Sequence, residues 1–311
     1  MTGPLESFDR KIARAQQHFE TVEAEIRAFR ERKPYLVAKY GNPYQTEYRV
    51  QGQERPPEHL LVTIGDVLQN ARSALDHLAW RLAGNDPPRG TAFPVYEKQD
   101  DYFARDRKGD PAANSGLFRV AALPEAVRTY IESVQPYNET DVGRALGGLH
   151  YFARLDRHRS VNLVGGASQV VRFNAGRRDA NGVLRPGAPG EQGTIDIRLG
   201  QFDDGTVIAT FTHPAGVEVE FDVAVDVGLS DGIPGKPFVP LLSALRAFVF
   251  VVRDEVIPKL KPYLPAQAAR PWSPDEPSRH VDLGFVDMTL GEVVLTSELS
   301  PDKPPPGLRP S

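Results

Sequence analysis

Hydrophobic residues recur at spacings of three and four along the first part of the chain, which is the pattern of amphipathic helices. One such helix is predicted over residues 5–33, and a second begins after Pro57 and ends at the Gly- and Pro-rich stretch 84–90. Between them, residues 34–52 are aromatic and β-branched on both sides of a Gly-Asn-Pro sequence, which predicts a β-hairpin.

The hydrophobic period changes farther along the chain. Weak periodicity over 85–122 predicts loops with short helical pieces, whereas 124–134 and 140–161 predict two more helices. Over 168–228 apolar and polar residues alternate, which predicts an antiparallel meander of about four strands. A helical period returns at 238–257.

These elements predict an α+β protein, namely a helical bundle with an inserted or packed antiparallel β-sheet of about four strands. We divide the chain into a helical bundle with its N-terminal hairpin at 1–164, a β meander at 165–232 and a further bundle helix at 233–264. The remainder, 265–311, is rich in proline, and we expect an edge strand within 280–299 and a disordered end.

Charge and cysteine content narrow the function classes. The 311 residues include 37 basic and 41 acidic side chains, and a net charge of −4 gives no general attraction to nucleic acid, so any polyanion site must be local. The absence of cysteine excludes disulfides, a thiol nucleophile and thiolate-bound zinc, and it fits a reducing cytoplasm. No phosphate-loop motif is present, and we assign no cofactor and no metal.

Neither a signal peptide nor a membrane span is predicted. The start of the chain, MTGPLESFDRK, lacks an apolar core. The most apolar run, 238–252, is shorter than the ~20 residues that span a bilayer and contains Arg246. We therefore expect a cytoplasmic protein with no membrane partner.

The second predicted helix carries three charged or titratable residues at the edge of its apolar stripe. Arg72 and Asp76 are four residues apart, so their side chains can pair. His77 lies about 140° from Arg72 around the helix axis, so these two could share a site only at a groove or across a subunit contact. We select Arg72, Asp76 and His77 as candidate catalytic residues.

A second charged cluster lies on the helix predicted at 140–161. Asp156 extends an apolar stripe, which is unusual for a carboxylate, and four arginines make this helix locally basic. It is the best candidate for an anion-binding surface. The candidate ligand-binding residues are Arg154, Asp156, His158 and Arg159.

Two other interpretations of the clusters stay open. Charged residues at the edges of packed helices often form structural ion pairs, and a non-catalytic scaffold would need no more than that. Metal binding would use Asp76, His77, Asp156 and His158, although the sequence contains no His-Glu-x-x-His or Glu-x-x-His motif. Any joint role requires that the two helices bring their polar side chains into one pocket.

Three motifs together resemble a widespread group of bacterial proteins. The motifs are ARSALDHLAW (71–80), ESVQPYN (132–138) and LHYFARLDRHRSVNL (149–163), with Arg157 at a position where the group usually has lysine. These motifs and the helices around them cover about a third of the chain. The resemblance implies no established activity.

The spacing of Arg72 and His77 is also similar to the Arg-x4–6-His signature of HEPN-domain proteins, which are small α-helical bundles. Many of these are metal-independent ribonucleases that act as dimers, and others are catalytically inert. By this resemblance Arg72 would steady the scissile phosphate and His77 would move the proton as the RNA 2′-hydroxyl attacks, with Asp76 orienting the imidazole. Ser73 stands where the family usually has Asn, Asp or His. The resemblance implies RNA cleavage or RNA binding, with RNA as the partner and a homodimer as the assembly.

Overall fold

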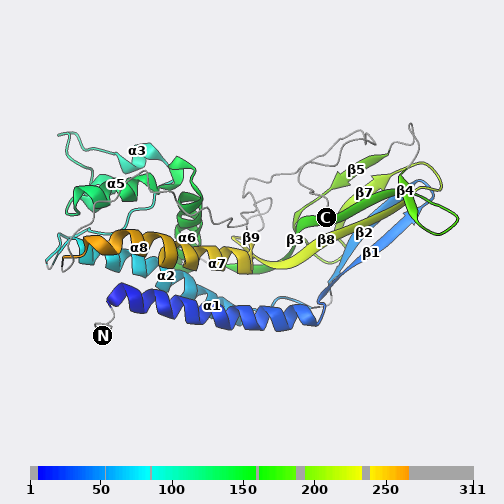
Figure 1. Cartoon of the computed structure of the whole chain (residues 1–311), viewed down its shortest axis with the longest axis horizontal. Helices are drawn as coiled ribbons and strands as arrows, with labels where there is room; N and C mark the ends of the chain where they lie inside the picture. The colour runs from blue at the N-terminus through cyan, green and yellow to red at the C-terminus, as the bar shows by residue number, and fades with distance from the viewer. Residues whose placement is uncertain are drawn as a thin grey trace. The chain divides into compact units, whose positions relative to one another are not determined.

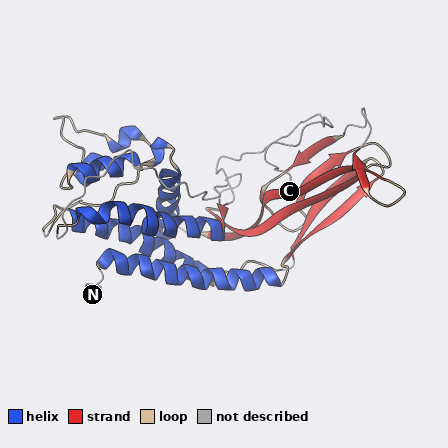
Figure 2. Cartoon of the chain, in the orientation of Figure 1, coloured by secondary structure: helices blue, strands red, loops and turns tan. Residues whose placement is uncertain are grey.

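The chain forms a helical unit and a β unit. The computed structural model describes residues 6–52, 54–84, 86–158, 161–186, 193–232 and 239–265. Within these ranges the helical unit is drawn from 6–27, 58–162 and 241–265, and the β unit from 28–57 and 163–240. Figure 2 shows that helices and strands separate almost completely between the two units. The predicted α+β class is confirmed.

The helical unit contains the helices that the hydrophobic period predicts. Its long helices are α1 (Ser7–Glu31), α2 (Leu60–Leu82), α5 (Glu125–Ser133) and α6 (Asp141–His158), as labelled in Figure 1. The last turn of α1 belongs to the β unit. Two short helices, α3 (Gln99–Tyr102) and α4 (Gly116–Val120), lie in the weakly periodic stretch, and a 3-10 turn, η1 (Pro136–Asn138), joins α5 to α6.

Helix α2 packs against both α6 and α7 (Leu241–Phe250). Its inward face is apolar throughout and buried, so the hydrophobic effect drives this face into the core. Gly65 is part of that face, and a methyl group built there would lie 2.7 Å from Asp156 Oδ1 of α6. The absence of a side chain at Gly65 therefore lets the two helices approach closely enough for the Asp156 carboxylate to fit between them.

The last helical stretch, predicted over 238–257, begins at Leu241, and its hydrogen-bonding pattern changes midway. After α7 the backbone forms a π-helical stretch, η2 (Val251–Val256), then α8 (Ile257–Leu260) and a 3-10 turn, η3 (Lys261–Tyr263). Pro258 lacks an amide hydrogen and its ring crowds the carbonyl four residues earlier, so a widened turn before it keeps the helix continuous. Across the described ranges, none of the helices has both the length and the hydrophobicity that crossing a membrane requires.

The β unit contains two sheets. In the first, the strand order is β1 (Tyr35–Asn42), β2 (Gln45–Gly52), β7 (Val207–Thr212) and β5 (Thr194–Ile197). In the second, the order is β4 (Leu184–Pro186), β3 (Asn162–Arg178), β8 (Glu218–Ser230) and β9 (Val239–Pro240), and β6 (Gly200–Gln201) also pairs with β3. Neighbouring strands pair in antiparallel fashion, as in β2–β7, β5–β7 and β8–β9.

The two sheets share one hydrophobic core. Phe211 of β7, Tyr48 of β2 and Phe221 of β8 are all buried in the same cluster, so inward-facing side chains of both sheets meet there. This arrangement is a β-sandwich. The sequence predicted the main strands correctly, but the single meander of about four strands is wrong, because alternation shows that a strand is half-buried without showing which strand it pairs with.

The predicted hairpin at 34–52 is confirmed, but its place in the fold is not the expected one. Strands β1 and β2 pair in register from Tyr35↔Gly52 to Asn42↔Gln45, so the two-residue turn is Pro43-Tyr44, directly after Gly41 and Asn42. Because β2 also pairs with β7, the hairpin belongs to the β unit and not to the helical block 1–164. The predicted edge strand within 280–299 and the end of the chain lie outside the described residues.

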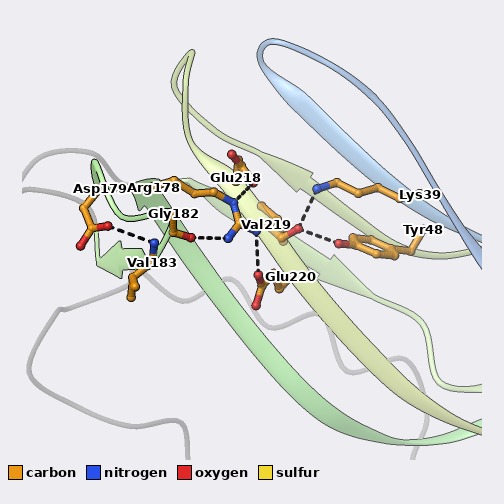
Figure 3. Close-up of polar contacts among 9 residues, drawn as sticks. All are labelled: Lys39, Tyr48, Arg178, Asp179, Gly182, Val183, Glu218, Val219 and Glu220. Atoms are coloured by element: carbon orange, nitrogen blue, oxygen red, sulfur yellow. Dashed lines mark hydrogen bonds and ion pairs between the residues drawn. The ribbon is translucent and has the colours of Figure 1, made fainter.

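One carbonyl of β8 links the two sheets of the sandwich, as Figure 3 shows. The backbone oxygen of Val219 accepts a hydrogen bond from the Tyr48 hydroxyl at 2.7 Å and another from Lys39 Nζ at 2.9 Å. Tyr48 and Lys39 come from β2 and β1 of the first sheet, whereas Val219 belongs to the second. These bonds pair polar groups that the packing of the two sheets would otherwise bury without a partner.

We predict that Tyr48→Phe lowers the free energy of unfolding by about 1 kcal/mol, because it removes one buried hydrogen bond and leaves the ring in place. Tyr40→Phe is the matched control, since the Tyr40 hydroxyl bonds Gln51 at the exposed surface, and its effect should stay within about 0.5 kcal/mol. Urea unfolding of the whole chain measures both. Equal effects of the two variants would show that the bond to Val219 adds no stability.

Candidate functional site

One pocket of the helical unit collects polar side chains from α2, α4 and α6. On α6, His150, Ala153, Arg154 and Arg157 line it; these positions follow the i, i+3, i+4, i+7 spacing of a single helix face. Arg72 and Asp76 of α2, Arg119 of α4 and the extended residues 92–96 form the other walls. The cavity volume is about 360 Å³. The two predicted charged clusters therefore do converge, in part, on one pocket.

The wall formed by residues 92–96 is fixed first by the pair Arg72–Asp76. One Arg72 nitrogen donates to Asp76 Oδ1 at 2.9 Å, and a second donates to the carbonyl of Phe93 at 2.7 Å. The amide of Phe93 donates in turn to Asp76 Oδ1 at 3.1 Å. Because both polar groups of the buried Phe93 backbone have partners on α2, this loop segment is held against the helix.

Gln135, from the Gln-Pro-Tyr motif, fixes the other end of the same segment. Its side-chain nitrogen donates to the carbonyls of Pro94 at 3.0 Å and Ile131 at 2.8 Å, and its oxygen accepts from the amide of Tyr96 at 3.0 Å. The side chain is fully buried, so water cannot reach its polar atoms and these bonds supply the partners that they need.

Small residues on α6 let the Gln-Pro-Tyr turn lie directly on that helix. A methyl group built on Gly143 would lie 2.7 Å from the Gln135 carbonyl oxygen, and one on Gly147 would lie 3.2 Å from a Pro136 ring carbon. The turn, the wall segment and the pocket face of α6 are thereby set in place together.

The charge of the pocket is strongly positive, in contrast to the acidic chain as a whole. Four guanidinium groups and one carboxylate line the cavity, which leaves three net positive charges. Of these four arginines, Arg72 is paired with a carboxylate, whereas Arg119, Arg154 and Arg157 have no carboxylate partner among the described residues. Arg119 bonds the Tyr96 hydroxyl and Arg157 bonds Gln69, both neutral groups. Unneutralised arginines around a cavity are the arrangement of an anion site.

His150 is a neutral group within this positive surface. Burial and the neighbouring charges of Arg72 and Arg154 lower the pKa of its imidazole to about 4, although Asp76 acts in the opposite direction. Near neutral pH the ring therefore carries one N–H donor and one free acceptor nitrogen. It offers hydrogen bonds to a ligand without adding charge.

The structure brings together only some of the residues selected from the sequence. Arg72, Asp76 and Arg154 line the pocket, whereas His77 is not among its lining residues. Asp156 lies on the α2–α6 contact, where its carboxylate accepts a hydrogen bond from Gln69 at 3.0 Å. The side chain of His158 and all of Arg159 lie outside the described residues.

Sequence reasoning missed several residues that build the pocket. His150 shares the helix face of Arg154 and Arg157, and this spacing was the signal that could have identified it. Arg119 and Gln135 carried no such signal, because both reach the site from segments whose positions depend on long-range packing. Gln69 also links the two helices, donating to the Ala153 carbonyl at 2.7 Å as well as to Asp156.

Comparisons with known proteins add no assignment to this geometry. Searches of family models, curated proteins and solved structures found no match for the chain. The resemblance to HEPN-domain proteins therefore stays a prediction. Within the part of the chain that the structure describes, no three His, Asp or Glu side chains come together as a metal site would require.

We predict that Gln135→Leu destabilises the protein by about 3 kcal/mol, because it leaves the partly buried amide of Tyr96 and two carbonyls without partners. Asn138→Ala is the control in the same turn: Asn138 is exposed and makes one side-chain bond, to the Glu132 carbonyl, so the loss should be below about 1 kcal/mol. Thermal and urea unfolding compare the two variants. A loss no greater for Gln135→Leu than for the control would contradict the assigned role.

We predict a pH dependence of stability that belongs to His150. Its folded pKa of about 4 lies below the ordinary histidine value of 6.5, so between these pH values the unfolded chain binds more protons and the free energy of unfolding falls as the pH falls. His150→Gln should flatten this part of the profile, whereas His77→Gln, outside the pocket, should leave the His150 contribution in place. If stability depended on pH with the same slope in wild type and in His150→Gln, the pKa of His150 would not be depressed in the folded protein.

Proposed function

We propose that the helical unit binds RNA, and that the pocket between α2, α4 and α6 holds phosphate groups of the bound strand. The observation that carries this proposal is the set of three arginines that face the cavity without a carboxylate partner among the described residues. Arg119, Arg154 and Arg157 have free donors, and a guanidinium group matches the geometry of two phosphate oxygens. A local positive site also explains how an acidic chain could attract a polyanion.

The resemblance to HEPN-domain proteins supports RNA as the class of ligand. A HEPN-like helical bundle, a cytoplasmic location and a homodimer are parts of this same proposal. Binding, rather than cleavage, is the activity we propose, because the signature residues Arg72 and His77 do not share the pocket. The arginine of that pair is also engaged already with Asp76 and with the Phe93 backbone.

A second candidate function is a non-catalytic scaffold whose Arg-Asp network is structural. The contacts of Arg72 and Asp76 favour it for these two residues, since both hold the wall segment at Phe93. It gives no reason for the uncompensated charges of Arg154 and Arg157. The two functions therefore predict different effects when those exposed arginines are neutralised.

We predict that the double variant Arg154→Gln/Arg157→Gln binds a short single-stranded RNA roughly tenfold more weakly than wild type, because two charge-assisted contacts are lost. The slope of log affinity against log salt should fall by about 1.4, as expected for two phosphate contacts to a single strand. Fluorescence anisotropy over a salt series measures both quantities.

Arg144→Gln serves as the matched control for this experiment. Arg144 lies at the other end of α6, outside the pocket, and pairs with Asp141, so RNA affinity should be unchanged. Circular dichroism and the melting temperature establish that all variants fold. Failure of the wild type to bind RNA, or equal affinities for wild type and the double variant, would refute the proposal and favour the scaffold.

A further inference from the structure

The pocket has the size and charge of a site for one phosphorylated end rather than for an extended stretch of strand. Its volume, about 360 Å³, falls in the range of small-molecule sites, roughly 300–1,000 Å³. We propose that it accepts a terminal phosphomonoester of a ribonucleotide, carried by an RNA end or by a free mononucleotide. This inference rests on the RNA binding proposed above and names the part of the ligand that enters the pocket.

Charge is the first argument for a phosphomonoester. An internal phosphodiester carries one negative charge, whereas a terminal phosphomonoester approaches two near neutral pH, because its second pKa is about 6. The three net positive charges of the cavity lining therefore favour the end group over an internal phosphate. A surface that binds only internal phosphates of RNA can spread its positive charges along the strand and does not need several of them at one cavity.

Exposure is the second argument. The Arg72 side chain is only 13 % exposed and His150 is half-buried, whereas Arg154 and Arg157 are exposed. A group inserted toward Arg72 and His150 loses more water than one that stays beside Arg154, and electrostatic attraction is stronger where water is excluded. A doubly charged end that contacts both His150 and Arg154 therefore gains the most, and the exposed Arg157 suits the phosphate that follows it.

Asp76 and His150 explain why the ligand would be a ribonucleotide and not inorganic phosphate alone. Asp76 Oδ1 accepts from Arg72 and from the Phe93 amide, and no described residue donates to Oδ2. A carboxylate repels phosphate but accepts a hydrogen bond from a sugar hydroxyl. The ribose would therefore lie toward Asp76, while the phosphate would lie toward His150 and Arg154. The imidazole of His150 can donate to a phosphate oxygen while it remains neutral.

The test compares RNAs of one sequence that differ only at their ends. The full-length protein is titrated, by fluorescence anisotropy, with RNA bearing a 5′-phosphate, a 3′-phosphate or hydroxyls at both ends, and AMP is used as a competitor. We expect at least one phosphorylated RNA to bind roughly tenfold more tightly than the hydroxyl form, and AMP to displace it. In Arg154→Gln this preference should shrink, whereas the control Arg144→Gln should keep it.

The outcomes separate this inference from the proposed function. Equal affinities for all three RNAs would overturn the inference while leaving RNA binding intact. Displacement of a labelled mononucleotide by AMP, with no binding of any RNA, would support the phosphomonoester site and refute RNA as the ligand. A preference for phosphorylated ends that persists fully in Arg154→Gln would place the end group elsewhere and would also overturn the inference.

Discussion

The pocket depends on how one loop segment without secondary structure of its own is held in place. Residues 92–96 are fixed by Arg72 and Asp76 at Phe93 and by Gln135 at Pro94 and Tyr96. Phe93 is fully buried, so these bonds satisfy backbone groups that water cannot reach. Without these bonds the segment would not be held against α2, and the cavity would lose one wall.

The packing of α2 on α6 sets the other walls. Gly65 leaves room for the Asp156 carboxylate, and Gln69 joins the two helices through Asp156 and the Ala153 carbonyl. This fixed contact turns the face of α6 that carries His150 and Arg154 toward the cavity. Asp156, selected as a ligand-binding residue, thus acts on the geometry of the site from the helix contact.

The sequence predicted what depends on local periodicity. The inward positions of α2 and the alternation of β7 were sufficient to identify a helix and a strand. It could not predict that β2 pairs with β7, because the partners are more than a hundred residues apart and alternation does not choose between partners. For the same reason the sequence pattern predicts a single sheet where the structure has a sandwich.

The site was predictable to a similar degree. Arg72 and Asp76 are four residues apart on one helix, so their pairing follows from helix geometry alone. The depressed pKa of His150 does not follow from helix geometry alone, because it arises first from burial and then from Arg72 on α2 as well as from Arg154 on its own helix. Arg119 likewise reaches the pocket from a short helix in a weakly periodic stretch. Local spacing identified the charges, and long-range packing decided which of them meet.

If the neutral His150 and the uncompensated arginines together form a phosphate site, a bound phosphate must change the pKa of this histidine. NMR titration of the His150 imidazole, with and without saturating AMP, tests this claim at the site itself. A bound phosphate would offset the repulsion from the neighbouring guanidinium groups, so we expect a His150 pKa of about 4 in the free protein and a clearly higher one with AMP. An unchanged pKa at saturation, or one near 6.5 in the free protein, would contradict it.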